Sequence, residues 1–148
     1  MNVLVCEDGF EYIETLQRFL PELVWTRAGG GPAALQALTE GSFDALFLDM
    51  RFDRVPDEQL LGDLVAAADR FNGDSVQARH FLQDHQGTFV LAAVREAGWT
   101  LPVLMSYDFT DEPRRWSRLS TRFNPIDFLP DNAVPTDIRA KLNAMMPE

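Results

Sequence analysis

Acidic side chains follow two apolar segments of this chain, and a hydroxyl side chain ends a third. Glu7 and Asp8 come directly after one apolar run, Asp49 lies at the end of another, and Ser106 ends a later one. If these runs are parallel strands of one sheet, their carboxyl ends meet at the rim where open α/β sheets bind ligands. Carboxylates brought together repel one another, so they hold a proton or bind a hard cation. Mg²⁺ fits such a set best, because it takes oxygen ligands.

A structural interpretation of the same acids stays open. Acidic residues after strands also serve as turn residues and helix caps, and Asp8 could simply cap the helix that follows it. Three separate strand ends with polar side chains in the right order favour the binding pocket, with Ser106 as a hydrogen-bond donor to an oxyanion.

The segments that must position these side chains alternate between short apolar runs and helical periodicity. The predicted strands are 3–6, 23–28, 43–50, 102–106 and 125–129, and the predicted helices are 10–20, 32–39, 89–97, 112–123 and 135–145. This alternation predicts an α/β fold with a doubly wound parallel sheet that helices cover on both faces. In the strand order 2-1-3-4-5, the first and third strands are neighbours, which would bring Glu7, Asp8 and Asp49 together.

Residues 51–86 exceed what this minimal pattern needs. A helix start at 56–59 is followed by apolar residues at helical spacing, 72–74 is a turn, and 75–86 has the pattern of a second helix. We expect an inserted helical hairpin within a single domain that covers 1–148, since the insertion is too short to carry its own core.

Composition narrows the classes of function. The 148 residues carry a formal net charge of −10, which makes binding to nucleic acid or an anionic membrane by charge alone unfavourable. The single cysteine, Cys6, excludes an internal disulfide. The first residues have no basic start, and no apolar run has the length of a membrane span, so we expect a soluble, cytoplasmic protein. Lys141 is the only lysine.

The sequence resembles the receiver domain of two-component response regulators. The segments that carry the resemblance are 3–8, 43–50, 101–106 and 128–130, and the apolar run into Asp49-Met50 is the most specific of them. The resemblance covers most of the chain apart from about 51–86. It implies a flavodoxin-like (CheY-like) sheet of order 2-1-3-4-5 with an inserted helical hairpin.

The resemblance also implies roles for individual residues. Glu7, Asp8 and Asp49, with the backbone carbonyl of Arg51, would bind Mg²⁺. Asp49 would accept a phosphoryl group from a histidine kinase or a phosphotransfer protein, and Ser106 would contact that group and move with the switch. An aspartate carboxylate is a usable nucleophile for this transfer, and positioning with charge neutralisation supplies most of the catalysis.

The chain differs from the family at one position that usually has a positively charged side chain. Receiver domains have a lysine before the proline that follows the fifth strand, and here that position is Leu129. Leucine cannot form the ion pair that holds phosphoryl oxygens, and Lys141 does not match the position. The position in the fifth strand where the family usually has the switch aromatic corresponds to Ile126 here. Three arginines are candidates for the missing cation: Arg51, Arg114 and Arg115.

Two functions therefore compete, and the intact acid pair, Asp49 and Ser106 favour the first of them. In the first, the chain is a single-domain receiver that is phosphorylated on Asp49 with Mg²⁺ and signals to a downstream protein. In the second, it is a degenerate receiver that acts through protein contacts without phosphorylation. A small hydrolase of the haloacid-dehalogenase kind is a third alternative, which Arg51 argues against, because that class has a second aspartate at this position. Neither nucleic acid nor a membrane is expected as a direct partner, and a homodimer stays open.

Overall fold

The computed structural model describes residues 1–147 and contains a five-stranded sheet whose strands are all parallel. The strands are β1 (Asn2–Cys6), β2 (Val24–Ala28), β3 (Ala45–Asp49), β4 (Val103–Ser106) and β5 (Ile126–Phe128). Their order across the sheet is β2-β1-β3-β4-β5, which confirms the predicted topology. Short apolar, β-branched runs form these strands because both faces of a parallel sheet are buried.

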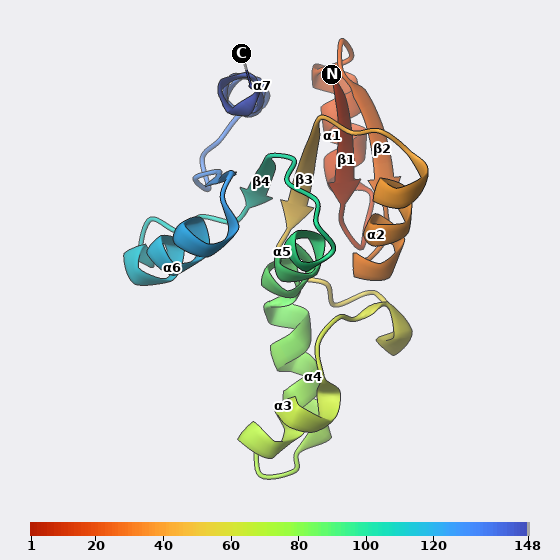
Figure 1. Cartoon of the computed structure of the whole chain (residues 1–148), viewed down its shortest axis with the longest axis vertical. Coiled ribbons are helices and arrows are strands. Elements are labelled where there is room, and N and C mark those ends of the chain that lie inside the picture. Colours follow the sequence, from red (N-terminus) through yellow and green to blue (C-terminus); the bar gives the residue numbers. More distant parts are fainter. Residues whose placement is uncertain (148) are drawn as a thin grey trace.

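Helices cover both faces of the sheet (Figure 1). The helices α1 (Glu11–Phe19) and α7 (Pro135–Met145) pack on one face, and α2 (Gly31–Glu40), α5 (Gln86–Glu96) and α6 (Pro113–Phe123) pack on the other. Alternate residues of each strand supply the two cores: Val3 and Val5 face α1 and α7, whereas Leu4 and Cys6 face the other layer. Within residues 1–147, no helix is long and apolar enough to cross a membrane.

Strand register sets the rim at the carboxyl ends. Cys6 pairs with Leu48, so the residues after β1 emerge beside the end of β3. Asp49 pairs with Ser106, so the last residues of β3 and β4 are direct neighbours. The sheet therefore brings together the polar side chains that the sequence places after separate strands.

The insertion forms a short 3-10 turn, η1 (Asp57–Gln59), and two helices, α3 (Leu64–Arg70) and α4 (Ser75–Asp84). The two helices pack on each other as a hairpin beyond the carboxyl ends of the strands (Figure 1). The expectation of one helix running from residue 56 to Ala68 is wrong. Gly62 has a φ of 106°, which ends any helix there, and Asp63 starts α3 by accepting hydrogen bonds from two amides of its first turn.

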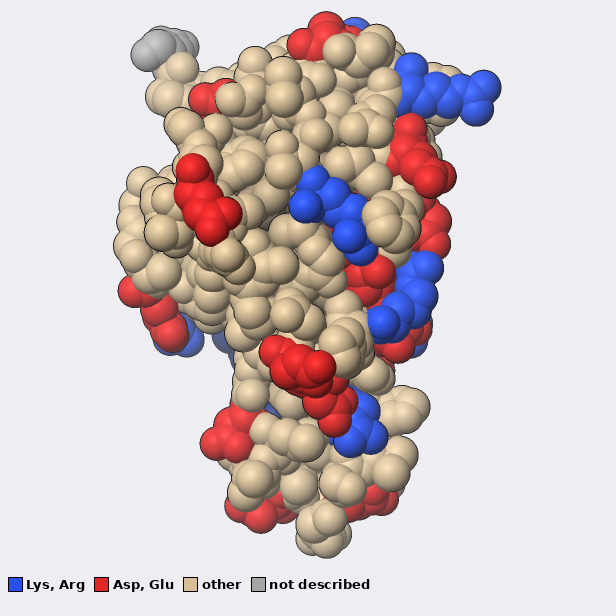
Figure 2. Space-filling view, turned by 90° about the vertical axis from the view of Figure 1, so that its right-hand side faces the viewer, with Lys and Arg blue, Asp and Glu red and all other residues tan. Residues whose placement is uncertain are grey.

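Acidic and basic side chains are interspersed on the face of the molecule that Figure 2 shows, including the end formed by the hairpin. Within the insertion, Arg79 of α4 donates two hydrogen bonds to Asp57 of η1, at 2.9 and 3.0 Å. Ion pairs of this exposed kind contribute little to stability individually.

Helix α5 begins against the backbone that follows Asp49. The amide of Gly87 donates to the carbonyl of Met50 at 2.9 Å, and a Cβ at residue 87 would lie 2.5 Å from the Asp49 carbonyl oxygen. Only glycine allows this approach of two backbones.

We expect Gly87→Ala to lower the free energy of unfolding by about 1–3 kcal/mol, because an added methyl group must push α5 away from β3. Chemical denaturation measures this change. Gly29→Ala is the control, since its Cβ would meet only the end of the flexible Arg27 side chain, at 3.3 Å. Equal stabilities of Gly87→Ala and the wild type would contradict the close packing.

Candidate functional site

Asp49 is the centre of the candidate site. Its carboxylate lies at the end of β3, half-buried, and accepts a hydrogen bond from the amide of Met50 at 2.8 Å. The pKa of Asp49 is raised to about 7: burial is the largest cause, the nearby carboxylates of Asp8 and Glu7 add to it, and the hydrogen bond from Met50 opposes it. A negative charge on Asp49 is therefore disfavoured near neutral pH.

The carboxylate of Glu7 accepts hydrogen bonds from the start of α1. Its side chain is buried, and its two carboxylate oxygens accept hydrogen bonds from the amides of Tyr12 and Ile13, at 3.1 and 2.8 Å. These amides belong to the first turn of α1, where amide groups have no partner within the helix. Glu7, and not Asp8, therefore satisfies the start of α1. Burial raises the pKa of Glu7 in spite of the two hydrogen bonds.

Asp8 is surrounded by donors from the insertion. Its side chain is 2% exposed. One oxygen, Oδ2, accepts from the backbone amides of Asp53 and Arg54 at 3.0 and 2.9 Å, and from Nε of Arg54 at 3.4 Å. The other, Oδ1, accepts from Nη2 of Arg54 at 3.2 Å. Each carboxylate oxygen has about two lone-pair positions, so Oδ2 is fully used and Oδ1 is partly used.

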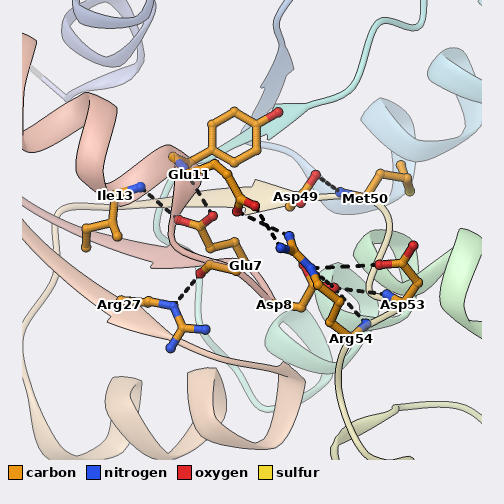
Figure 3. Close-up of polar contacts among 11 residues, drawn as sticks. Glu7, Asp8, Glu11, Ile13, Arg27, Asp49, Met50, Asp53 and Arg54 are labelled. Carbon is orange, nitrogen blue, oxygen red and sulfur yellow. Dashed lines mark hydrogen bonds and ion pairs between the residues drawn. The ribbon is translucent and has the colours of Figure 1, made fainter.

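The guanidinium of Arg54 bridges two acids (Figure 3). Besides Asp8, it contacts Glu11 in the first turn of α1, with Nη1 to Oε1 at 2.7 Å and Nη2 to Oε2 at 3.2 Å. The contact with Arg54 lowers the pKa of Glu11 to about 2. Arg54 thus places a positive charge beside Asp8, in the cluster formed by Glu7, Asp8 and Asp49, which is called the acidic pocket below.

This geometry does not fit the predicted magnesium site. Both oxygens of Glu7 accept hydrogen bonds from backbone amides, and the guanidinium of Arg54 contacts both oxygens of Asp8, where a shared cation would have to bind. Within residues 1–147, no group of three or more histidine, cysteine or acidic side chains has an arrangement that could hold a metal ion. The magnesium ligands Glu7, Asp8, Asp49 and the Arg51 carbonyl stay a prediction that these contacts do not support.

Ser106 has a partner that the sequence did not indicate. Its hydroxyl forms a 2.6 Å hydrogen bond with the phenol oxygen of Tyr12, from the opposite element α1. The ring of Tyr12 packs on Phe47 of β3, with centroids 5.2 Å apart. The hydroxyl that the resemblance assigns to a switch is thereby held in one orientation by a neighbouring side chain.

Leu129 occupies the position of the expected lysine. Its side chain is 6% exposed and belongs to the apolar cluster beneath α1 and α7. A cavity of about 180 Å³ borders Leu129, Tyr12 and Ser106. The only lysine lies elsewhere: Nζ of Lys141 pairs with Asp127 at 3.2 Å.

The three arginines predicted as substitute cations have other surroundings. Arg51 pairs with Asp84 of α4 at 3.1 Å, and its side chain is 67% exposed. Arg114 is exposed on α6. Arg115 pairs with Glu112 at 3.2 Å and places Nη2 3.9 Å from the sulfur of Met50. Among these three, Arg115 therefore contacts the residue next to Asp49, although no ion pair joins it to that carboxylate.

Comparison with solved structures defines the class of fold: this is the fold of response regulator receiver domains. A Francisella response regulator receiver domain matches 97% of this chain and 94% of its own, with a TM-score of 0.65 and 14% identity. The receiver domain of NtrX from Brucella abortus matches 97% and 96%, with a TM-score of 0.65 and 15% identity.

A third similar structure was solved as a complex. The response regulator TrrA from Thermotoga maritima, solved in complex with Mg²⁺ and BeF, matches 98% of both chains with a TM-score of 0.60 and 16% identity. No protein-family model matches the chain, and no curated protein does. The resemblance seen in the motifs is therefore confirmed as a shared fold.

Sequence reasoning missed three residues of the site: Tyr12, Glu11 and Arg54. Glu11 and Tyr12 follow Asp8 by three and four residues, and they lie in the first turn of α1. Arg54 reaches the pocket through an irregular segment, whose path has no periodic signal. The charge pattern of Glu7, Asp8, Glu11 and Arg54 was visible, but their contacts were not.

Proposed function

We propose that this chain is a receiver-fold signalling module that acts through protein contacts and does not depend on phosphorylation of Asp49. The observation that carries the proposal is Leu129, a buried leucine in an apolar cluster where receiver domains have a lysine. A phosphoryl group on Asp49 would have no ammonium from this position to hold its oxygens.

The surroundings of Asp49 support the same function. With a pKa of about 7, its carboxyl group is only partly ionised near neutral pH, whereas an ordinary aspartate is fully ionised there. Ser106 already has a hydrogen-bond partner in Tyr12, so it would have to break that contact before meeting a new oxyanion. Both features favour a site in which Asp49 is partly protonated and Ser106 stays bonded to Tyr12.

Magnesium-dependent phosphorylation of Asp49 by a histidine kinase is the second candidate. Asp49 and Ser106 are register partners at the rim, as that chemistry requires, and the Thermotoga neighbour is a receiver in complex with Mg²⁺ and BeF. Receiver domains generally exchange phosphoryl groups with kinases or phosphotransfer proteins, so such a partner belongs to this candidate.

Incubation with acetyl phosphate and MgCl₂, followed by intact-mass measurement, separates the two. We expect no phosphoryl adduct and no change in tryptophan fluorescence, because Leu129 replaces the lysine and the guanidinium of Arg54 already contacts Asp8. An adduct that disappears in Asp49→Asn would contradict the proposal and establish the second candidate. Continuous release of phosphate from a phosphate ester would point to the hydrolase.

A further inference from the structure

The acidic pocket already contains a positive group, and it comes from the insertion. Four hydrogen bonds join Asp8 to the segment 53–54, and two more join the same guanidinium to Glu11. The pair is asymmetric in exposure: the side chain of Asp8 is 2% exposed and that of Arg54 is 54% exposed. A buried carboxylate needs such a partner, because an unpaired buried charge is costly.

The backbone around the pocket is shaped to accept this arginine. A Cβ at residue 9 would overlap the Glu11 carboxylate and the Arg54 guanidinium, so Gly9 leaves the space that the ion pair fills. The carbonyl of Gly9 accepts a hydrogen bond from Nε of Arg27 at 2.6 Å, which fixes this turn from the side of β2. The two amides that bond to Asp8 hold residues 53 and 54 in place, independently of the guanidinium.

We propose that Arg54 is the resident cation of the acidic pocket, and that it excludes divalent metal ions by occupying Asp8. The inference goes beyond the proposed function, because it concerns which cation the pocket holds. A planar guanidinium with several donors satisfies a buried carboxylate without the water ligands that Mg²⁺ retains. The arginine also joins the start of the insertion to α1 through Glu11. If Arg54 leaves the pocket, the start of the insertion therefore loses its contact with α1.

Metal titration of matched variants tests the proposal. The wild type, Arg54→Gln and Arg79→Gln are titrated with MgCl₂ and MnCl₂ by calorimetry, with no phosphodonor present. Arg79→Gln is the matched control, because it removes the same charge from the same insertion and also breaks a carboxylate pair, with Asp57. We expect Arg54→Gln to bind Mn²⁺ at least about tenfold more tightly than the wild type, and Arg79→Gln to bind as the wild type does.

Two outcomes would overturn the proposal. The first is equal metal affinity of the wild type and Arg54→Gln, and the second is the same gain in Arg79→Gln, which would mean that net charge alone controls binding. Neither outcome depends on whether Asp49 accepts a phosphoryl group, so the failure of this inference and that of the proposed function are distinguishable.

A measurement on the wild type keeps the proposal testable if Arg54→Gln does not fold. The amides of Asp53 and Arg54 donate to Asp8, so their hydrogen exchange and NMR shifts report occupancy of the pocket. We expect both amides to be protected and unaffected by MgCl₂. Rapid exchange, or a saturable shift of these amides with Mg²⁺, would show that the arginine is not resident.

Discussion

We expect the variant Asp49→Asn to be more stable than the wild type at pH 8, and we expect this advantage to disappear at acidic pH. The pKa of Asp49 is about 7 in the folded chain against an ordinary value of 3.8, and burial is the largest cause. Below about pH 3.8 the carboxyl is protonated in both the folded and the unfolded state, so it costs nothing. As the pH rises toward 7, the unfolded chain loses this proton first, and the folded state loses stability relative to it.

The size of the effect follows from the shift. A difference of one pKa unit corresponds to about 1.4 kcal/mol, so we expect Asp49→Asn to gain about 2–4 kcal/mol of unfolding free energy above pH 7. The asparagine amide oxygen still accepts from Met50, and it carries no charge.

Urea denaturation at several pH values between 4 and 8 measures this difference. The control is Asp111→Asn, since Asp111 is exposed and its replacement removes the same charge from the surface. A constant difference between Asp49→Asn and the wild type across this range would contradict the raised pKa.

The second large effect concerns Arg95, which lies at the end of α5 on the opposite side of the sheet from α1. Its guanidinium donates to four backbone carbonyls, those of Trp99, Leu101, Phe123 and Pro125, at 2.8 to 3.0 Å. It therefore joins the segments that lead into β4 and β5, and these strands position Ser106 and Leu129. Its partial burial lowers the pKa of Arg95.

We expect Arg95→Met to lower the free energy of unfolding by about 2–4 kcal/mol, because it leaves several carbonyls without a donor. Arg95→Lys should recover only part of this loss, since one ammonium cannot reach four acceptors held by a planar fork. Thermal and chemical denaturation measure the loss. Arg118→Met on the exposed face of α6 is the control, and equal effects of the two methionine variants would contradict the role of Arg95.

The sheet and its rim could be predicted because their signals are local. Each strand is a short apolar run, each is followed by a helix with a buried stripe, and only a few topologies connect such units. Asp49 and Ser106 then meet because parallel strands end at one edge, as their register confirms. The position of Leu129 also followed from the sequence, because it directly precedes Pro130 at the end of the fifth strand.

The contacts of the acidic pocket could not be predicted for a physical reason. Helical and strand periodicities say which face a residue takes, but the segment between β3 and η1 has neither periodicity. Arg51 and Arg54 are both close to Asp49 in sequence, and only the path of this segment decides that Arg54 returns to Asp8 while Arg51 turns to Asp84. The same limit explains the error at the start of the hairpin, where Gly62 interrupts an apolar pattern of helical spacing.

The junction of α4 and α5 has a mechanical consequence. Only His85 separates the two helices, and Figure 1 shows them stacked end to end. The two helices together run from the hairpin to one face of the sheet. Near the start of α5, the amide of Gly87 donates a hydrogen bond to the carbonyl of Met50. A displacement of the hairpin along this axis therefore acts on the backbone beside Asp49 through a single hydrogen bond.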